Sequence, residues 1–476
     1  MCASRQIYTL KMCVSTQYFG LFVLLWRMRR KIYNDLLRWK QEEQGRCALL
    51  IDGARRVGKS YIVREFAAGE YRSALIIDFS IARAEVKQLF SDYAGDIDML
   101  FMNLMSIYNV TLYHRESLVV FDEVQECPPA RQAIKHLVAD GRYDYIETGS
   151  LVSIKRNVKN IIIPSEERHI TLYPMDFEEF LWAVGNETMM DAIRMNYGRK
   201  HPMGPLHRKA MELLRQYMIV GGMPQAVLAF VETKSFERTD RMKRDILALY
   251  KADIAKYATG QETHVSGIFD QIPSQLQRHE RRFKLSSVSK GGRMRDFQNS
   301  FFWLSEAMTV NIAYNTTEPN VGLGMNVERS SLKCYMADTG LLLSMAFDEN
   351  TIVSEELYRK LLLDKLEVNA GMLMENLVAQ MLRAAGHKLY FYSNNSREEA
   401  SDRMEVDFLI SKSAITSRHN ISPIEVKSGR RYAITSLNKM IDKYSNYLST
   451  SYVIHTANYA EKDAITYLPV YMVPLL

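Results

Sequence analysis

The sequence predicts an α/β protein, because short apolar runs alternate with amphipathic helical patterns over its first half. The runs 49–52, 73–80 and 117–121 have the composition of strands that are buried on both faces. Helical patterns follow the first two of these runs. Strands and helices that alternate along a chain build a parallel sheet with helices on both faces. We therefore expect such a layered core in the N-terminal part.

The first strand leads into a glycine-rich turn, and Leu49 to Ser60 reads L-L-I-D-G-A-R-R-V-G-K-S. The spacing G-x-x-x-x-G-K-S between a strand and a helix is that of a phosphate-binding loop. Glycines allow backbone N–H groups to surround phosphate oxygens, and the helix N-terminus attracts the anion. Lys59 would reach the outer phosphates, and the Ser60 hydroxyl would hold Mg²⁺. An ordinary glycine turn needs neither side chain, so we predict a P-loop NTPase core that binds ATP and Mg²⁺.

The third strand, S-L-V-V-F-D-E, ends in two carboxylates. Asp122 would hold Mg²⁺ through water, and Glu123 would orient or deprotonate the attacking water. An apolar strand ending in Asp-Glu is common by itself, but here it follows a P-loop, so we predict ATP hydrolysis. The predicted nucleotide-binding residues are Gly53, Ala54, Arg55, Arg56, Val57, Gly58, Lys59, Ser60, Tyr61, Asp122 and Ser150.

A fourth strand is expected at 143–150, where Thr148 and Ser150 are candidates to sense the γ-phosphate. A hydroxyl group that caps the next helix is the alternative. Arg168 could also contact phosphate, but we favour an exposed arginine beside Glu166 and Glu167. A further strand and a capped helix are predicted between residues 170 and 182.

These motifs together suggest a known family. The set G-A-R-R-V-G-K-S, F-D-E-V-Q, T-G-S, Y-P-M-D-F-E-E-F-L-W and V-G-G-M-P resembles prokaryotic AAA+-type ATPases, close to the archaeal-type ATPases, that carry a C-terminal endonuclease-like region. The similarity extends over nearly all of the chain from Met28 onward. It implies a winged-helix element between the two ends.

The densest basic segment, 278–295, reads R-H-E-R-R-F-K-L-S-S-V-S-K-G-G-R-M-R. It precedes a predicted helix at 296–308 and a predicted strand at 309–314, in the place where the resemblance implies the winged helix. A basic loop that faces the DNA backbone and an ordinary solvated run of charges both fit this pattern. The predicted DNA contacts are Arg281, Arg282, Lys284, Lys290, Arg293 and Arg295.

The C-terminal part carries a second set of charged residues. Glu375 lies on a predicted helix at 371–382, Asp407 on a strand at 404–410, and Glu425 and Lys427 on a strand at 423–428. Side chains alternate along a strand, so Glu425 and Lys427 would share one face. Carboxylates that hold Mg²⁺ beside a lysine suit phosphodiester hydrolysis.

This order resembles the PD-(D/E)XK restriction-endonuclease-like nucleases, with Val406 in place of the proline that gives the motif its name. A salt-bridged strand pair, or a nuclease fold that only binds, would give the same pattern. The predicted catalytic residues are Lys59 and Glu123 at the first site and Asp407, Glu425 and Lys427 at the second. The predicted metal ligands are Ser60, Asp122, Glu375, Asp407 and Glu425.

We divide the chain into a misplaced start or disordered tail (1–27), an ATPase core (28–204), a helical lid with a winged-helix-like region (205–345) and a restriction-endonuclease-like α/β domain (346–476). The helices of 205–277 are interpreted as packing only, and Asp338 is expected to cap a helix. The chain would then be an ATPase coupled to a DNA-binding, nuclease-like domain. The alternative is an ATP-gated switch whose C-terminal fold cuts nothing.

Composition is consistent with a soluble globular protein: 47% of the 476 residues are hydrophobic and the net charge is +6. The five cysteines form neither a closely spaced pair nor a metal-binding pattern, which favours the cytoplasm and buried thiols. The apolar run 18–26 is shorter than the ~20 residues that span a bilayer, so no membrane contact is expected. Homo-oligomerisation is left open.

Overall fold

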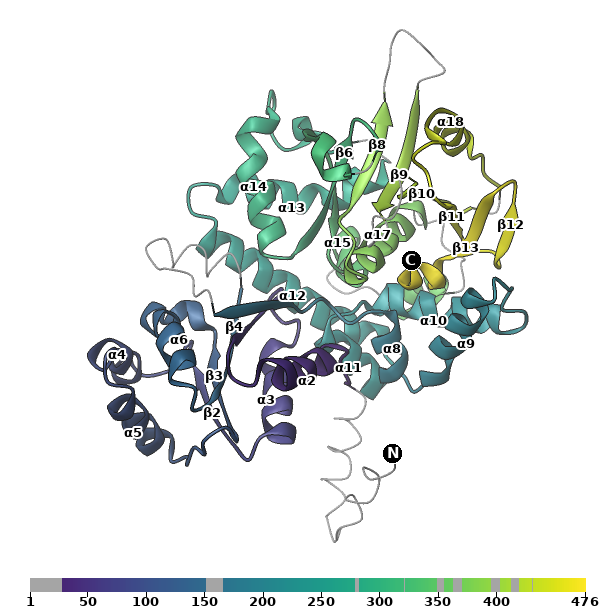
Figure 1. Ribbon diagram of the computed structural model, residues 1–476. Coiled ribbons are helices and arrows are strands. Elements are labelled where there is room, and N and C mark those ends of the chain that lie inside the picture. Colours follow the sequence, from purple (N-terminus) through teal and green to yellow (C-terminus); the bar gives the residue numbers. More distant parts are fainter. Residues whose placement is uncertain are drawn as a thin grey trace.

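The protein was analysed as a computed structural model. The residues described are 28–150, 166–278, 282–320, 322–348, 355–362, 370–394, 403–411, 419–429 and 431–476. The predictions on residues 1–27 and on Arg281 lie outside these ranges. Figure 1 shows a five-stranded sheet toward the lower left, an eight-stranded sheet toward the upper right, and helices between them.

The N-terminal sheet is parallel throughout, as predicted. Its strands lie in the order β2-β3-β4-β1-β5. Their bounds are β1 Ala48–Asp52, β2 Ser73–Asp78, β3 Ser117–Asp122, β4 Asp144–Gly149 and β5 Glu167–Thr171. The central strands β1, β3 and β4 are buried along their whole length. Because parallel strands end at the same edge, the carboxyl ends of β1, β3 and β4 meet there.

Alternate residues of these strands enter two separate cores, so both faces of the sheet are covered. Leu49 and Ile51 of β1 belong to one core, together with side chains of α2 (Ile32–Glu43) and α3 (Lys59–Glu70). Leu50 belongs to the other core, with side chains of α4 (Ala84–Asp92), α5 (Ile97–Tyr108) and α6 (Pro128–Asp140). This arrangement confirms the predicted helices on both faces.

The basic residues before α2 hold the short helix α8 (Phe177–Ala183) against the core. Arg30 Nε lies 3.1 Å from Glu179 Oε2, and Lys31 Nζ lies 2.5 Å from Asp176 Oδ2. Asp176 and Glu179 also form a capping box, which confirms the predicted capped helix. The acidic motif D-F-E-E therefore forms ion pairs with the basic segment before α2.

The remaining helices belong to the middle and the C-terminal part of the chain, and the last of them packs against the second sheet. Their bounds are α9 Glu187–Gly198, α10 Leu206–Val220, α11 Pro224–Thr233, α12 Phe236–Tyr257, α13 Glu262–Gln277, α14 Met294–Glu306, α15 Thr339–Ala346, α16 Glu355–Leu362, α17 Ala370–Ala384 and α18 Thr435–Tyr444. The long helix α12 crosses the middle of the molecule between the two sheets (Figure 1).

The second sheet joins the middle of the chain to its C-terminal part. Its strands lie in the order β12-β13-β11-β10-β9-β8-β6-β7. Their bounds are β6 Val310–Thr316, β7 Val327–Met336, β8 Tyr390–Asn394, β9 Met404–Ser411, β10 Ile421–Val426, β11 Ser451–His455, β12 Ala460–Lys462 and β13 Ile465–Pro469. Strand β6 pairs antiparallel with β7 and parallel with β8. The hairpin β6–β7 is therefore continuous with the C-terminal strands.

Gly222 and Gly340 let three backbone segments approach one another closely: the segment around Met175, the segment 221–222 and the start of α15. A Cβ atom on Gly222 would lie 2.1 Å from the carbonyl oxygen of Met175, and one on Gly340 would lie 2.6 Å from the nitrogen of Gly221. The buried Asp338 accepts hydrogen bonds from the N–H groups of Gly222 (2.5 Å) and Leu341 (2.9 Å), so it caps α15 as predicted. The V-G-G-M-P motif is thus a close-packing element.

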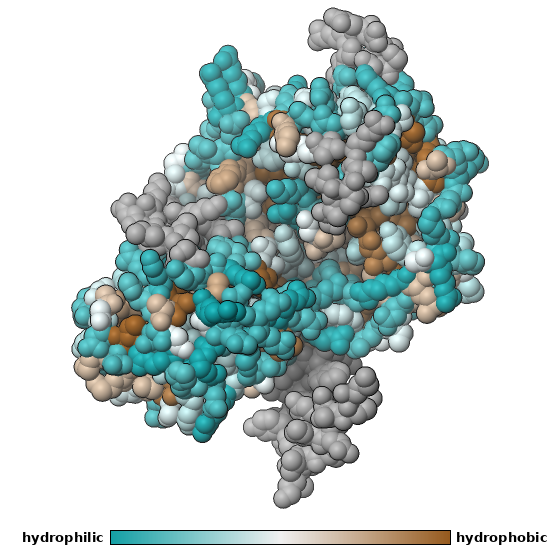
Figure 2. All heavy atoms as spheres, viewed as in Figure 1, coloured by the Kyte–Doolittle hydropathy of each residue, from teal (hydrophilic) through white to brown (hydrophobic). Residues whose placement is uncertain are grey.

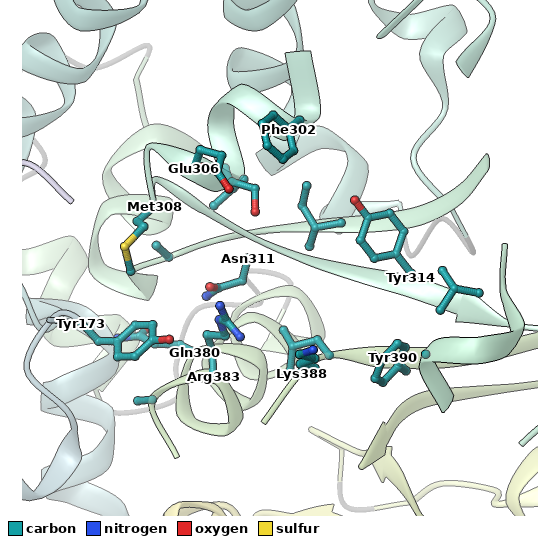
Figure 3. A pocket seen from close by; sticks show the side chains of 18 of the residues that line it. Tyr173, Phe302, Glu306, Met308, Asn311, Tyr314, Gln380, Arg383, Lys388 and Tyr390 are labelled. Carbon is teal, nitrogen blue, oxygen red and sulfur yellow. The ribbon is translucent and has the colours of Figure 1, made fainter. Parts of the chain in front are cut away.

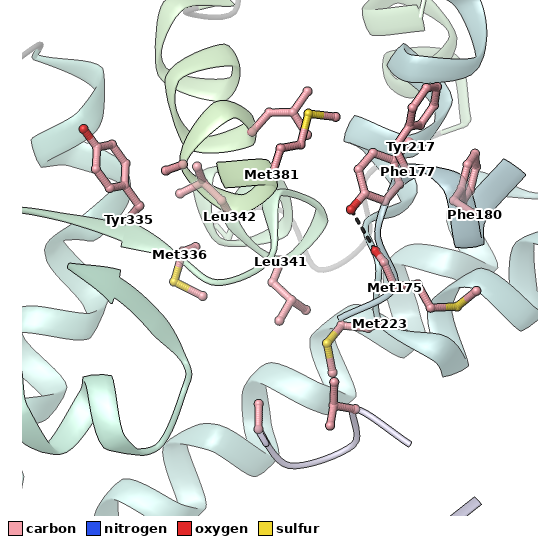
Figure 4. Packing of buried hydrophobic residues seen from close by; sticks show 14 of the residues in the cluster. Met175, Phe177, Phe180, Tyr217, Met223, Tyr335, Met336, Leu341, Leu342 and Met381 are labelled. Carbon is pink, nitrogen blue, oxygen red and sulfur yellow. Dashed lines mark hydrogen bonds between the residues drawn. The ribbon is translucent and has the colours of Figure 1, made fainter. Parts of the chain in front are cut away.

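Hydrophobic side chains surround this contact (Figure 4). Met175, Phe177 and Phe180 come from the predicted ATPase core, whereas Leu341, Leu342 and Met381 come from α15 and α17. The hydroxyl of Tyr217 donates to the carbonyl oxygen of Met175 at 2.8 Å. The same hydrophobic core therefore extends from the first sheet to the second.

The surface in Figure 2 is mostly hydrophilic, with hydrophobic residues exposed at the end formed by α4 and α5. Among the described helices, none combines the length and apolar character needed to cross a membrane. Of the described cysteines, Cys127 and Cys334 are buried and Cys47 is half-buried, and all three are free thiols.

Candidate functional site

The glycine-rich loop lies between β1 and α3, as its sequence predicts. Gly58 precedes α3 with φ +100°, a backbone conformation that a side chain disfavours. A Cβ atom on Gly53 would lie 2.5 Å from the carbonyl oxygen of Leu172, just after β5. The Arg30 guanidinium group also holds the loop, because it donates a hydrogen bond to the carbonyl oxygen of Val57 at 2.9 Å. The loop is therefore held in a closed shape by its surroundings.

Lys59 is buried at the start of α3. Its ammonium group donates to the carbonyl oxygens of Gly53 (2.9 Å) and Ala54 (3.1 Å), so the side chain folds back over the loop. Burial lowers the pKa of Lys59, and the carboxylates of Glu123 and Asp122 oppose this shift. A cation at this place suits the outer phosphates of a nucleotide.

The predicted magnesium ligands lie side by side. The Ser60 hydroxyl donates to Asp122 Oδ1 at 2.9 Å, and Thr148 of β4 donates to the same oxygen. A hydroxyl and a carboxylate oxygen beside a phosphate-binding loop are ligands that Mg²⁺ accepts. The donor set therefore fits Mg²⁺. Thr148 lies beside Asp122 at this site, a position that agrees with the predicted polar sensor of the γ-phosphate on β4.

Glu123 follows β3 with φ +53°, which turns its side chain away from the strand direction. Its N–H group donates to Thr148 Oγ1 at 3.2 Å, and its carboxylate accepts from Gln125 Nε2 at 2.5 Å. Both contacts orient the predicted base. Glu123 also lines the pocket beside the loop, where an attacking water would have to lie.

This pocket has a volume of about 280 Å³ and is closed by residues that the sequence did not indicate. Of the predicted nucleotide-binding residues, Arg55, Lys59 and Ser150 line it, whereas the other loop residues, Tyr61 and Asp122 do not. The predicted catalytic residue Glu123 also lines it. The opposite wall comes from the middle of the chain and consists of Tyr250, Asp253, Lys256, Tyr257, Trp303, Ala307 and Thr309.

Two direct contacts join α12 to the loop. Arg55 Nη1 lies 2.5 Å from Asp253 Oδ1, and the Tyr250 hydroxyl donates to the carbonyl oxygen of Arg55 at 3.1 Å. The interpretation of residues 205–277 as packing only was therefore wrong for α12. Helical periodicity shows which face of α12 is apolar, but it gives no signal for what the polar face meets.

Trp303 of α14 adds an unsatisfied donor to the same wall. Its indole Nε1 is buried and finds no acceptor in the described part of the chain. A buried donor without a partner costs free energy, so an acceptor atom of a bound ligand would stabilise it. The pocket therefore suits a ligand with hydrogen-bond acceptors beyond its phosphates.

Arg168 does not belong to this pocket. It is about half-exposed and pairs with Glu42 (3.5 Å) and Glu43 (2.5 Å) of α2. An exposed, ion-paired arginine was the favoured interpretation, although the partners are those of α2 rather than Glu166 and Glu167.

The second predicted site forms a cluster of acids around a lysine. Glu375 of α17 and Asp407 of β9 lie near Lys333 of β7, whose Nζ is 3.1 Å from Glu375 Oε1 and 3.8 Å from Asp407 Oδ1. Glu405 approaches the same Nζ at 3.0 Å. Sequence analysis missed Lys333 and Glu405, since a single lysine on a strand has no characteristic spacing. Only the alternation of Glu405 with Asp407 on β9 could have indicated one of them.

Glu425 and Lys427 complete this cluster from the end of β10. Lys427 Nζ lies 2.7 Å from Glu425 Oε1, and Glu425 Oε2 is buried without a hydrogen-bond partner among the residues described. The Val426 N–H group donates to Asp407 Oδ2 at 2.8 Å. Glu425 and Asp407 are therefore neighbours, as the spacing predicted.

Burial dominates the titration of the cluster. It raises the pKa of Asp407 well above its usual value, and Glu425 and Glu375 add to this effect. Burial alone would lower the pKa of Lys333, but Glu375, Asp407 and Glu405 raise it. Within the described ranges, no three histidine, cysteine or acidic side chains are grouped to hold a metal ion. The predicted ligands face lysine ammonium groups instead.

The basic segment begins beside this cluster. Arg282 lines a small recess together with Lys333 and Glu375. Lys290 and Arg293 follow on the loop that leads to the predicted helix, observed as α14, and Arg295 lies in the first turn of that helix. Of these predicted DNA contacts, Arg282 is thus the one that lies beside the acidic cluster.

Comparison with protein families divides the chain into three parts. Residues 45–181 match the model of an AAA domain. Residues 211–351 and 370–473 match two different domains of unknown function, DUF8612 and DUF4143. Together with the geometry of the loop, the first match makes residues 45–181 similar to P-loop domains of the AAA type. The matches to the other two parts assign no activity.

Solved structures with a similar fold are distant. A Walker-type ATPase of Pyrococcus abyssi is 16% identical with a TM-score of 0.38, covering 67% of this chain and 95% of its own. The ORC1 protein of Aeropyrum pernix in complex with DNA is 9% identical (TM-score 0.26; 67% and 93%). Cdc6p of Pyrobaculum aerophilum is 12% identical (TM-score 0.25; 76% and 97%). No curated protein matches the chain.

Proposed function

We propose that this protein is a Mg²⁺-dependent ATPase whose bound nucleotide controls a DNA-binding C-terminal half. One observation carries the first part: Ser60 and Asp122 lie 2.9 Å apart beside a closed phosphate loop, with Glu123 next in the chain. Lys59 and the loop N–H groups would hold the phosphates, and Ser60 and Asp122 would hold Mg²⁺. The bound ion would neutralise phosphate charge. Glu123 would take the proton of the attacking water.

The wall formed by α12 and α14 supports the proposed control. Arg55 is paired with Asp253, and phosphate would compete with that carboxylate for the guanidinium group. Release of Asp253 would loosen α12, which lies between the two sheets (Figure 1). Nucleotide binding would in this way act on the C-terminal half through α12.

Hydrolysis is tested with two variants of the loop site. Purified protein should hydrolyse ATP with Mg²⁺, and Lys59→Ala should reduce the rate at least about 100-fold because phosphate contacts are lost. Glu123→Gln should still bind ATP but hydrolyse it slowly. Lys209→Ala, on the exposed face of α10, is the matched control and should behave as wild type. Hydrolysis that persists in Lys59→Ala would mean that the loop is misassigned.

The role of the pocket wall formed by α12 and α14 is tested by the fluorescence of Trp303. Nucleotide binding should change the tryptophan emission, because a ligand atom would accept the hydrogen bond of Nε1. Trp303→Phe should abolish this change, whereas Trp39→Phe, on the buried face of α2, should preserve it. An emission change that Trp303→Phe leaves intact would refute the assignment of this wall.

For the C-terminal half, we favour DNA binding without cleavage over a metal-dependent nuclease. The observation that favours it is Lys333, whose ammonium group stands between Glu375, Glu405 and Asp407 where a metal ion would need to enter. The basic segment beside the cluster would contact the DNA backbone. The acidic cluster would then be a structural ion network.

Incubation of the protein with linear, nicked and branched DNA in Mg²⁺ or Mn²⁺ decides between DNA binding without cleavage and a metal-dependent nuclease. Wild type should cut none of these forms. Cleavage by wild type that Asp407→Ala abolishes would instead establish the metal-dependent nuclease. DNA affinity of an Arg282→Gln, Lys284→Gln variant should fall with a flatter salt dependence. Unchanged binding would show that the basic segment is only a solvated surface.

A further inference from the structure

A larger cavity, of about 690 Å³, lies where the ATPase part meets β6 and α17. Tyr173, just after β5, forms one side of it (Figure 3). Asn311 and Tyr314 come from β6, and Arg383 and Lys388 come from the end of α17 and the loop that follows. This cavity is separate from the nucleotide pocket and shares no lining residue with it.

The charge of the cavity is predominantly positive. Arg329, Arg383 and Lys388 line it, and Glu306 is the single acidic residue among the lining side chains. None of the three cations has an ion-pair partner among the described residues. The guanidinium carbon of Arg383 lies 5.7 Å from the centre of the Tyr173 ring. Three unpaired cations at one opening favour a ligand with several negative charges.

Aromatic side chains alternate with these cations. Tyr173, Tyr314 and Tyr390 line the cavity, and Phe302 at its border is 57% exposed. Met325, another lining residue, is 86% exposed. Exposed apolar side chains of this size are few on the described surface, and two of them lie here. Flat rings beside cations suit planar groups that are joined by anionic links.

The cavity continues into a second one and is therefore elongated. A neighbouring cavity of about 1060 Å³ shares Gly324, Met325, Lys388 and Tyr390 with the first. It extends to Ser422 of β10 and Tyr452 of β11. A continuous groove from Tyr173 to Tyr452 fits an extended polymer better than a compact small molecule.

We propose that this groove binds a single strand of nucleic acid. Arg383 and Lys388 contact phosphates, and Tyr390 stacks on a base. Bases paired in a duplex cannot reach such rings, so the strand must be unpaired. The inference deepens the proposed function, on which it rests for nucleic acid as the partner, and it gives an unpaired strand a binding place of its own, in addition to the contacts proposed for the basic segment before α14.

The test measures fluorescence anisotropy of a labelled oligo-dT strand, a duplex of equal length and a poly-glutamate peptide, at several salt concentrations. The double variant Arg383→Gln, Lys388→Gln should bind the strand about 10-fold or more weakly. The salt dependence should also flatten by about 1.4 in slope, since each single-strand phosphate contact contributes about 0.7. The matched control Arg38→Gln, Lys209→Gln removes two exposed cations outside the groove and should bind as wild type.

Tyr390→Leu gives an independent measurement, because it keeps an apolar side chain but removes the ring. It should weaken strand binding about 5-fold or more at all salt concentrations without changing the salt slope. Melting curves show whether each variant is folded. If a variant is not, protection of Lys388 of wild type from acetylation by bound strand replaces that measurement, and Lys209 should remain reactive.

Three results would overturn the inference: wild-type affinity in the groove double variant, stronger binding of poly-glutamate than of the strand, or no binding of the strand. ATP hydrolysis is measured on the same samples. Hydrolysis without strand binding would leave the ATPase assignment standing and remove the groove. If wild type binds the strand but hydrolyses no ATP, and the groove double variant loses strand binding, the groove is supported and the proposed ATPase is refuted.

Discussion

Replacement of Gly222 by alanine should destabilise the junction between the ATPase part and the C-terminal half. The added Cβ would lie 2.1 Å from the carbonyl oxygen and 2.9 Å from the nitrogen of Met175. Both atoms belong to the backbone, so no side-chain rotation can relieve the overlap. The segment after β5 must move by about 1 Å to restore an ordinary contact.

That movement would disturb two hydrogen bonds. Met175 N–H donates to the carbonyl oxygen of Gly222 at 2.7 Å, and Gly222 N–H donates to the buried Asp338 carboxylate at 2.5 Å. The first is worth about 1 kcal/mol and the second, to a charged group, about 1.5–3 kcal/mol. Steric strain adds about 1–3 kcal/mol. We expect a loss of up to about 3.5–7 kcal/mol, a large part of the ~5–15 kcal/mol typical of a domain.

Urea unfolding followed by tryptophan fluorescence measures this loss. Gly198→Ala is the matched control, because nothing lies within 4 Å of its Cβ position at the end of α9. The control should change the free energy of unfolding by no more than about 0.5 kcal/mol. If the two variants unfold within about 1 kcal/mol of each other, the close approach of Gly222 and Met175 is not an essential contact.

Three further measurements test other parts of the fold. Leu341→Ala should lower the free energy of unfolding by about 2–5 kcal/mol, because Leu341 is 1% exposed in the core between the halves; a loss below about 1 kcal/mol would contradict that packing. Arg131→Met should cost about 3–5 kcal/mol in thermal or urea unfolding, since it leaves Glu147 and Glu167 buried without their cation; a neutral effect would contradict the network. The hydrogen bond to Glu167 raises the pKa of His169. The stabilisation of the fold by protonated His169 is therefore complete below about pH 6.5 and is lost as the pH rises through the raised pKa. His169→Asn should remove that pH dependence of the unfolding midpoint, and an unchanged profile would refute it.

Much of the first site could be predicted from local sequence. The P-loop needs a strand, two glycines, a lysine and a serine at fixed spacing, and all lie within Leu49 to Ser60. Asp122 was predictable because a buried strand must end at the same edge of the sheet. The wall containing Asp253 was not, since it lies 198 residues from Arg55 and only tertiary packing brings the two together.

The second site shows the same division. The sequence order of Glu375, Asp407 and Glu425 indicated that a helix acid and two strand acids would gather at one place, and the Val426 N–H group indeed donates to Asp407. Lys333 lies 42 residues before Glu375, on a hairpin expected to belong to another region. Parallel pairing of β6 with β8 attaches that hairpin to the C-terminal sheet. This long-range pairing alone brings the lysine to the acids.

The sequence by itself determined that a nucleotide-binding loop and a parallel sheet exist, because both depend on short-range spacing and on the alternation of buried strands with helices. Only the tertiary structure decided what meets these elements. It placed α12 against the loop, Lys333 among the acids, and Tyr173 opposite Arg383 in the groove. Such contacts depend on how helices and sheets pack across the chain, and no local pattern of residues encodes that packing.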